Sequence, residues 1–221
     1  MHKITLVYSV HRENGLCNPQ ELQRVLRDID PEVIFAEFRP SEFDRYYKHG
    51  NLEAVALTML RNCKSFQMVP VDTYHLPTNL LLELKRAFDA VLDCVTELSH
   101  EYELLNQEND NHVSRGGFQY LNSSDGAAML ARIAEVEERT IIATGNQDLI
   151  CALASWRSFM QNRELEMVSN IYGYCKEHAF GNGALLVGAA HQNGIVGAIE
   201  RYRHSEAHLI DWAFAYAGAR N

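Results

Sequence analysis

Four polar side chains follow four apolar segments of this sequence, each just beyond the point where a strand is expected to end. They are His11, Glu37, Asp72 and His191. In an open parallel sheet, ligands bind outside the carboxyl ends of the strands. We therefore expect two imidazoles and two carboxylates to meet on one rim of a sheet.

Together these groups have the chemistry of a divalent metal site. Imidazole nitrogens and carboxylate oxygens are common ligands of zinc, manganese and cobalt ions. A metal in such a site lowers the pKa of a bound water and makes it a nucleophile. A single histidine or aspartate at a strand end more commonly caps a helix or bonds loop backbone. Four of them on one rim would be a costly cluster of buried polar groups, which favours a site.

The segments that must position these groups alternate between strand and helix. Continuous apolar runs at 4–10, 33–36 and 66–71 indicate strands of a parallel sheet covered on both faces. One intervening helix is opened by Asn18-Pro19-Gln20-Glu21, which provides an N-cap, a proline at N1 and a glutamate at N3. Apolar residues at helical spacing over 52–63 indicate the other helix. This order predicts a β-α-β-α-β unit with right-handed crossovers.

The middle of the chain has helical periodicity. Helices are expected from Thr78 to about Asn106, from Ser124 to about Glu138, and from about Asn146 to His178. The polar, glycine-bearing tract 106–124 is predicted to be a loop, either a mobile lid over the rim or plain surface chain. A strand at 184–188, a short helix at 195–202 and a closing strand at 208–215 complete the pattern.

The predicted fold class is therefore α/β, with a mainly parallel central sheet flanked by helices. An all-helical insert, at about 78–180, separates strands three and four. With 221 residues, of which 47% are apolar, the chain can bury one sizeable core, so we expect a single domain over 1–221.

Composition narrows the range of partners. The formal charge is -9 and no lysine or arginine run could follow a phosphate backbone, so no nucleic-acid partner is expected. No apolar stretch reaches the ~20 residues of a membrane span, and the first apolar run is too short for a signal peptide. The five cysteines are widely spaced and are expected to be reduced. These features predict a cytoplasmic protein with neither a nucleic-acid nor a membrane partner, and they do not indicate its oligomeric state.

Three segments resemble the TraB/PrgY/GumN/Tiki family, within the erythromycin-esterase-like and ChaN-like superfamily. They are Tyr8-Ser9-Val10-His11, Pro31-Glu32-Val33-Ile34-Phe35-Ala36-Glu37 and Val187-Gly188-Ala189-Ala190-His191-Gln192-Asn193-Gly194-Ile195. The family is marked by two Gly-x-x-His motifs, a glutamate that ends the second strand, and an arginine on a late helix.

The match to these marks is uneven along the chain. Gly188-Ala189-Ala190-His191 reproduces the second motif, whereas Tyr8 replaces the glycine of the first. The segment Arg163-Glu164-Leu165-Glu166-Met167 is similar to the late-helix motif, with Glu164 in place of its usual amide or aspartate. Residues 78–155 have no counterpart in the resemblance.

The resemblance implies a metal-dependent hydrolase of peptide or ester bonds, with a small-molecule or peptide substrate. Its divalent ion, manganese, cobalt or zinc, would be bound by His11, Glu37 and His191. The implied catalytic residues are Glu37, His191 and Arg163, with the arginine stabilising the developing oxyanion. From their chemistry alone, Arg39 and Asp72 are candidates for substrate binding, although Arg39 could equally pair with a surface acid.

Two other functions stay open. In the erythromycin-esterase branch of the superfamily the hydrolase is metal-free, with a histidine as general base on water and a glutamate that orients it. The ChaN branch binds haem, so a non-catalytic ligand-binding protein is the third reading.

Overall fold

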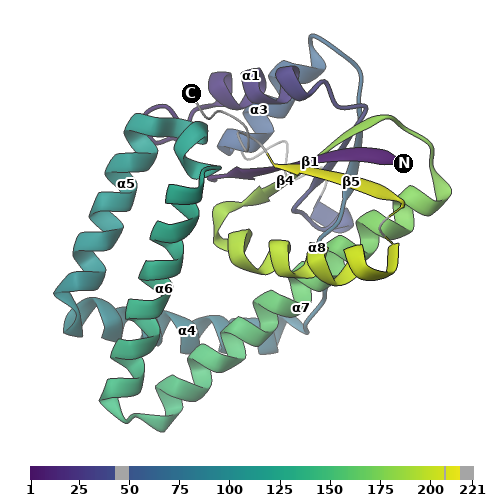
Figure 1. The fold of residues 1–221 in the computed structure, drawn as a ribbon. Coiled ribbons are helices and arrows are strands. Elements are labelled where there is room, and N and C mark those ends of the chain that lie inside the picture. Colours follow the sequence, from purple (N-terminus) through teal and green to yellow (C-terminus); the bar gives the residue numbers. More distant parts are fainter. Residues whose placement is uncertain (43–49, 207, 215–221) are drawn as a thin grey trace.

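The computed structural model describes residues 1–42, 50–206 and 208–214, and Figure 1 shows their arrangement. A five-stranded sheet lies at the centre, in the order β3-β2-β4-β1-β5, and every pair of neighbouring strands is parallel. The strands are β1 (His2–Ser9), β2 (Val33–Ala36), β3 (Gln67–Pro70), β4 (Asn182–Gly188) and β5 (Ile210–Phe214). The predicted α/β class with a mainly parallel sheet is confirmed.

Helices cover both faces of this sheet. On one face lie α1 (Pro19–Ile29) and α3 (Leu52–Arg61); α8 (Gln192–Glu206) and the second half of α7 (Gln147–Glu177) lie on the other (Figure 1). Two short 3-10 helices, η1 (Pro40–Glu42) and η2 (Ala189–His191), follow β2 and β4. The predicted start of α1 is confirmed, because the Asn18 side chain accepts a hydrogen bond from the Glu21 amide at 3.0 Å.

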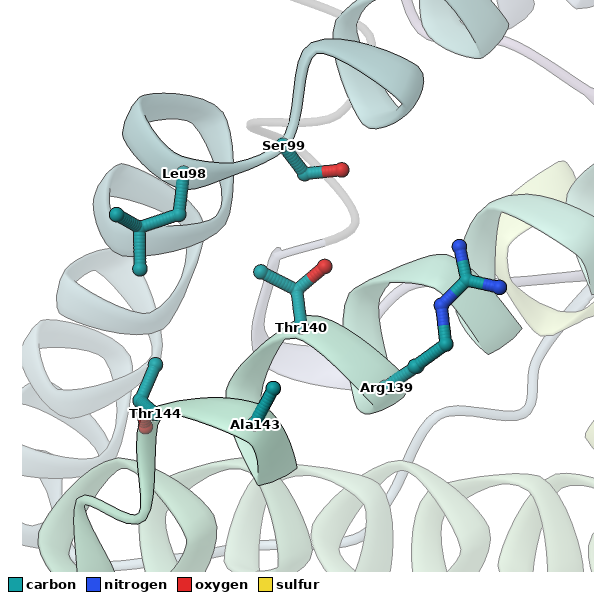
Figure 2. Close-up of a pocket in the computed structure, with 6 residues that line it drawn as sticks. All are labelled: Leu98, Ser99, Arg139, Thr140, Ala143 and Thr144. Carbon is teal, nitrogen blue, oxygen red and sulfur yellow. The ribbon is translucent and has the colours of Figure 1, made fainter.

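The helical insert between β3 and β4 consists of α4 (Thr78–Leu98), α5 (His100–Leu121), α6 (Ser124–Thr144) and the first half of α7. It has its own apolar cluster, formed by Val91, Val95, Ile141 and Leu153. A hollow of about 420 Å³ lies beside the end of α4 and the last turns of α6 (Figure 2). Figure 2 labels its lining residues, Leu98, Ser99, Arg139, Thr140, Ala143 and Thr144.

The prediction of a loop at 106–124 is wrong, since most of this tract belongs to α5. Its polar residues cover an exposed helix, while Leu105, Val113 and Leu121 are buried at nearly helical spacing and hold it in place. Gly117 marks a kink in α5, where the sequence had suggested a mobile lid. Gly117 has φ 56° and ψ -145°, and a side chain there would come within 2.8 Å of Leu16 Cβ.

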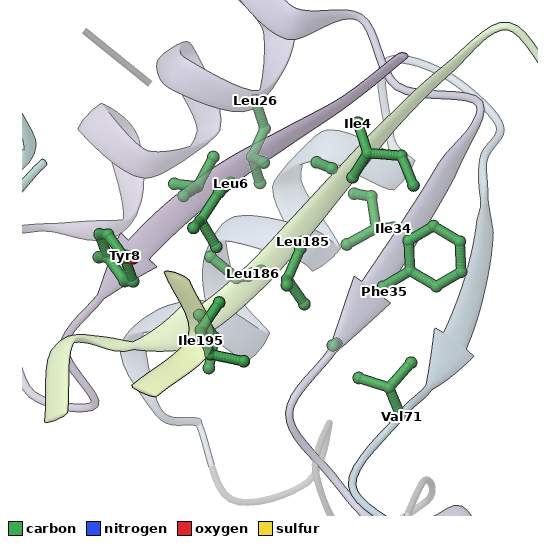
Figure 3. Packing of buried hydrophobic residues seen from close by; sticks show 14 of the residues in the cluster. Ile4, Leu6, Tyr8, Leu26, Ile34, Phe35, Val71, Leu185, Leu186 and Ile195 are labelled. Carbon is green, nitrogen blue, oxygen red and sulfur yellow. The ribbon is translucent and has the colours of Figure 1, made fainter. Parts of the chain in front are cut away.

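The main core packs around the sheet (Figure 3). All four residues of β2 are buried, as the unbroken apolar run predicted for a strand covered on both faces. Leu26 of α1 and Ile195 of α8 approach the sheet from opposite faces. Truncating one such leucine to alanine typically costs about 2–5 kcal/mol, so this core holds the strand ends in fixed positions.

In the part of the chain that the structure describes, no helix has the length and apolar character needed to cross a membrane.

Candidate functional site

The strand register brings the predicted residues to one rim, the carboxyl edge of the sheet. Ser9 pairs with Gly188 across β1 and β4, while Ala36 pairs with Leu186 on one side and Pro70 on the other. His11, Glu37, Asp72 and His191 follow these strands within three residues, so all four lie at the same edge, as expected.

Five of the rim side chains form a row of alternating charges, here called the ion chain: Asp72, Arg163, Glu37, His191 and Glu164. Arg163 donates to Asp72 through Nε (3.2 Å) and Nη2 (2.9 Å), and Nη2 also donates to Glu37 Oε1 at 3.0 Å. His191 lies 2.9 Å from Glu37 Oε1 through Nε2 and 2.9 Å from Glu164 Oε1 through Nδ1. The Arg163 guanidinium therefore points to the rim.

Both nitrogens of His191 therefore face carboxylates, and the side chain is only 3% exposed. Burial alone would lower the pKa of His191, but the hydrogen bonds to Glu164 and Glu37 outweigh it and raise the pKa to about 9. Since a carboxylate only accepts hydrogen bonds, this imidazole is doubly protonated at neutral pH. His191 is thus a fixed cation in this arrangement.

Glu37 lies at the centre of the rim and accepts three hydrogen bonds. Besides Arg163 and His191, the Gly188 amide donates to its Oε2 at 2.8 Å. Burial would raise the pKa of Glu37, but the hydrogen bond from His191, the charges of His191 and Arg163, and the Gly188 amide lower it to about 2. Glu37 therefore stays ionised throughout the physiological range.

His11 has a different environment. Its Nδ1 lies 3.0 Å from Glu53 Oε2, and the side chain of Glu53 is buried while that of His11 is 63% exposed. Ser9 Oγ donates to the other oxygen of Glu53. The hydrogen bond to Glu53 raises the pKa of His11; burial opposes the shift, and the charges of Glu53 and Glu37 add to it. The Nδ1 proton is thereby fixed on the Glu53 side, which leaves a lone pair on Nε2 in the neutral ring.

Nε2 of His11 and Oε2 of Glu37 both lie near one point above Gly188. A methyl group added to this glycine would lie 3.7 Å from His11 Nε2 and 3.3 Å from Glu37 Oε2. Gly188 therefore leaves room for a small group between a base and a carboxylate. This space explains why the Gly188-x-x-His191 segment has a glycine at its first position, since any side chain there would fill it.

A second glycine makes room for Glu164. A side chain on Gly194, in the first turn of α8, would come within 1.6 Å of Glu164 Oε2. The carboxylate packs directly against the amino end of this helix, where the helix dipole favours negative charge.

Tyr8, which replaces the glycine of the family's first motif, is buried and its hydroxyl donates to the Gln192 carbonyl at 3.1 Å. Burial and the nearby charge of Glu164 raise the pKa of Tyr8. The Tyr8 hydroxyl thus forms a hydrogen bond with the first residue of α8, which links β1 to that helix.

The rim meets one requirement of a metal site and fails three others. Each imidazole has its Nδ1 held by a carboxylate, as metal-ligating histidines require. However, across 1–42, 50–206 and 208–214 no three His, Cys, Asp or Glu side chains are grouped closely enough to hold a metal ion. Glu37 Oε1 also accepts from the Arg163 guanidinium, and His191 has no free lone pair. The residues as placed do not fit the predicted set of His11, Glu37 and His191, and we derive no step through a metal.

The two residues predicted to bind substrate lie in different settings. Asp72 is buried against Arg163, an arrangement that favours orienting the guanidinium over contacting a ligand. Arg39 is half-buried two residues beyond Glu37 and, among the described residues, is not part of the ion chain. The hollow of Figure 2 is lined by none of the predicted site residues, and its Arg139 is bound to Glu101 at 2.6 Å.

Sequence reasoning missed Glu53 and did not assign a role to Glu164. Glu53 is the second residue of α3, where an acidic side chain is usual at a helix start, so its type and place gave no signal. Glu164 was visible only as a departure from the late-helix motif. Both carboxylates reach their histidines across long stretches of sequence.

Comparison with protein-family models, with curated proteins and with solved structures found no match for this chain. The resemblance to the TraB/PrgY/GumN/Tiki family stays a prediction.

Proposed function

We propose that this protein is a hydrolase that cleaves an ester or peptide bond with a water activated by His11. The observation that carries the proposal is the placement of His11, whose Nδ1 is held by buried Glu53 while Nε2 lies near Glu37 above Gly188. The resemblance to the erythromycin-esterase superfamily supports the same class of reaction. In the erythromycin-esterase branch a glutamate orients the histidine base, and in this chain Glu53 would have that role.

The reaction would take place above Gly188. A water there can donate one hydrogen bond to His11 Nε2 and the other to Glu37 Oε2, since both lie near that point. The water oxygen attacks the carbonyl carbon, its proton passes to His11 Nε2, and the carbonyl oxygen becomes an oxyanion. Collapse of the oxyanion breaks the bond to the leaving alkoxide or amine, which takes the proton back from His11.

The ion chain has an electrostatic part in this proposal. His191 and Arg163 keep Glu37 ionised. Glu37 can therefore accept a hydrogen bond from the second O–H of the water without taking its proton. The role predicted for Arg163, stabilising the developing oxyanion, would act through its charge alone, because its Nε and Nη2 already donate to Asp72 and Glu37. Fixed charges in a partly dry site stabilise such a charge without reorganisation.

The test is turnover of 4-nitrophenyl esters and fluorogenic peptides by the purified chain and by His11→Asn. We expect the substitution to lower kcat by about a hundredfold or more, the usual contribution of a general base. His100→Asn is the matched control, because His100 is also exposed and lies 3.6 Å from a glutamate, Glu103, but belongs to the helical insert. Equal loss in both variants, or full activity in His11→Asn, would exclude His11 as the base.

The metal-dependent form of the hydrolase is tested by the same assay. We expect activity to be unchanged by EDTA and not to rise with added manganese, cobalt or zinc ions. Loss with EDTA and recovery with one of these ions would instead favour the predicted metal site. If no ester or peptide is turned over, a ligand-binding protein becomes the better reading, and absorbance near 400 nm after haem addition tests the ChaN-like alternative.

A further inference from the structure

The end of helix α5 contacts the chain on both sides of His11. Before His11, the Asn122 side chain accepts a hydrogen bond from the Tyr8 amide at 2.7 Å and donates one to the Tyr8 carbonyl at 3.0 Å. After His11, the Ser114 carbonyl accepts a hydrogen bond from the Leu16 amide at 2.8 Å. In Figure 1 the end of α5 lies beside the carboxyl end of β1. A helix of the insert thus holds both flanks of the segment that carries this histidine.

The kink at Gly117 gives the second of these contacts its shape. In a straight helix the Ser114 carbonyl would accept the amide four residues further on, whereas here it accepts the amide of Leu16. Gly117 has φ 56° and ψ -145°, a conformation that favours glycine. A Cβ atom there would lie 2.8 Å from Leu16 Cβ and 3.0 Å from the Leu16 carbonyl oxygen. We call Ser114, Gly117 and Asn122 the α5 clamp.

The chain held by the clamp after His11 is a tight turn. Asn14 and Cys17 form two backbone hydrogen bonds with each other, at 3.0 and 2.9 Å, and Gly15 between them has φ 57°. The Asn14 side chain donates to the Asp110 carbonyl of α5 at 3.2 Å. A Cβ atom on Gly15 would overlap the Ser114 carbonyl. The turn and α5 therefore meet backbone to backbone, and such close packing passes a displacement of one to the other.

His11 itself has little packing to hold its ring, because the side chain is 63% exposed. Its carbonyl accepts a hydrogen bond from the Leu52 amide at 3.3 Å, one residue before Glu53. The Glu53 carboxylate is buried and also accepts from Ser9, so its position is fixed. Whether the imidazole stays 3.0 Å from Glu53 thus depends on the course of the backbone on either side of His11.

We propose that the α5 clamp positions His11, by holding the chain on both sides of it so that the imidazole stays against Glu53 and close to the space above Gly188. The inference rests on the proposed function for the role of His11 as a base, while the placement of its ring can be tested without any turnover. The three clamp residues are positioning residues, since they act through the backbone of the histidine segment. The helical insert, which the resemblance does not cover, thereby gains a part in the reaction, because a displacement of α5 would move the base.

The test is an NMR titration of the His11 imidazole, whose signal is identified by its absence in His11→Asn. The hydrogen bond to Glu53 raises the pKa of His11, so losing that contact should move the midpoint to lower pH. Asn122→Ala removes both hydrogen bonds to Tyr8, and we expect this shift together with a kcat for 4-nitrophenyl esters that falls about ten- to a hundredfold at little changed KM. Asn106→Ala is the matched control, because Asn106 also donates to the carbonyl four residues back in α5, at 2.8 Å, but lies near the opposite end of the helix.

Gly117→Ala is a second, independent variant, since its methyl group would press on Leu16 and displace the turn. Its control is Gly145→Ala, where the backbone also has a positive φ, 63°, but nothing lies within 4 Å of the added methyl group. We expect a lowered His11 midpoint in Gly117→Ala and an unchanged one in Gly145→Ala. Midpoints that are the same in each variant and its control would overturn the inference. Lowered midpoints without ester turnover in any protein would support the clamp and count against the proposed hydrolase.

Discussion

At the residue scale, the two imidazoles of the rim differ in how many carboxylates they face. His191 has one at each nitrogen, so it is held as a cation between Glu37 and Glu164. His11 has one at Nδ1 only and is exposed. A histidine with one nitrogen held and the other directed at a shared point can accept a proton, whereas a doubly bonded imidazolium cannot. The contacts thus give two histidines of similar sequence context different roles.

The glycine between base and carboxylate gives a prediction at this scale. Gly188→Ala would place a methyl group where the attacking water is proposed to lie, 3.7 Å from His11 Nε2 and 3.3 Å from Glu37 Oε2, so Glu37 must shift by a few tenths of an ångström to admit it. We expect kcat to fall about a hundredfold or more, and thermal unfolding checks that the variant is folded. Activity close to that of the wild type would show that the water lies elsewhere.

At the element scale, the first turn of α8 packs directly against the Glu164 carboxylate at Gly194. Gly194→Ala would drive a methyl group to within 1.6 Å of the Glu164 carboxylate, so we expect destabilisation of about 1–3 kcal/mol from overpacking. Gly197→Ala on the same helix is the control, because nothing lies within 4 Å of the added methyl group. Alanine there should stabilise the protein by about 0.5–1 kcal/mol through helix propensity. Denaturant unfolding measures both, and equal effects would contradict the close packing of Glu164.

The elements also show what the sequence could and could not predict. The apolar runs and the cap at Asn18 predicted the strands and the first helix, and hence the rim, because parallel strands end at one edge. They did not predict the order of the strands in the sheet. The tract 106–124 was mistaken for a loop, since an exposed helix can be as polar as a loop and its buried residues are few. Glu53 could not be assigned, because its contact with His11 depends on how α3 packs after β2.

At the scale of the whole molecule, the ion chain joins β2, β3 and β4 to the long helix α7, so its protonation affects folding. The pKa of Glu37 is lowered from 4.5 to about 2, which gives stability that is present above pH 4.5 and lost as the pH falls through about 2. The pKa of His191 is raised from 6.5 to about 9, which gives stability that is present below pH 6.5 and lost as the pH rises through about 9.

We therefore expect the thermal unfolding midpoint to decline between about pH 6.5 and 9 in the wild type. Glu164→Gln removes one of the two carboxylates that hold the proton on His191 and so lowers the pKa of His191 in the folded protein, and the decline should therefore be smaller and end at lower pH. Differential scanning calorimetry across this range measures the effect. A pH dependence that is the same in the two proteins would contradict the fixed charge of His191.

The measurement that tests the central claim most directly is the pH dependence of kcat/KM for the wild type and for Glu53→Gln. Because His11 must be neutral to accept a proton and its pKa is raised by Glu53, activity should rise with pH through a midpoint above 6.5. Glutamine cannot stabilise the imidazolium as a carboxylate does, so the midpoint should move to lower pH and the maximal rate should fall. Glu103→Gln, beside exposed His100, should change neither. A midpoint that stays where it is in Glu53→Gln would contradict the assignment of His11 as the base.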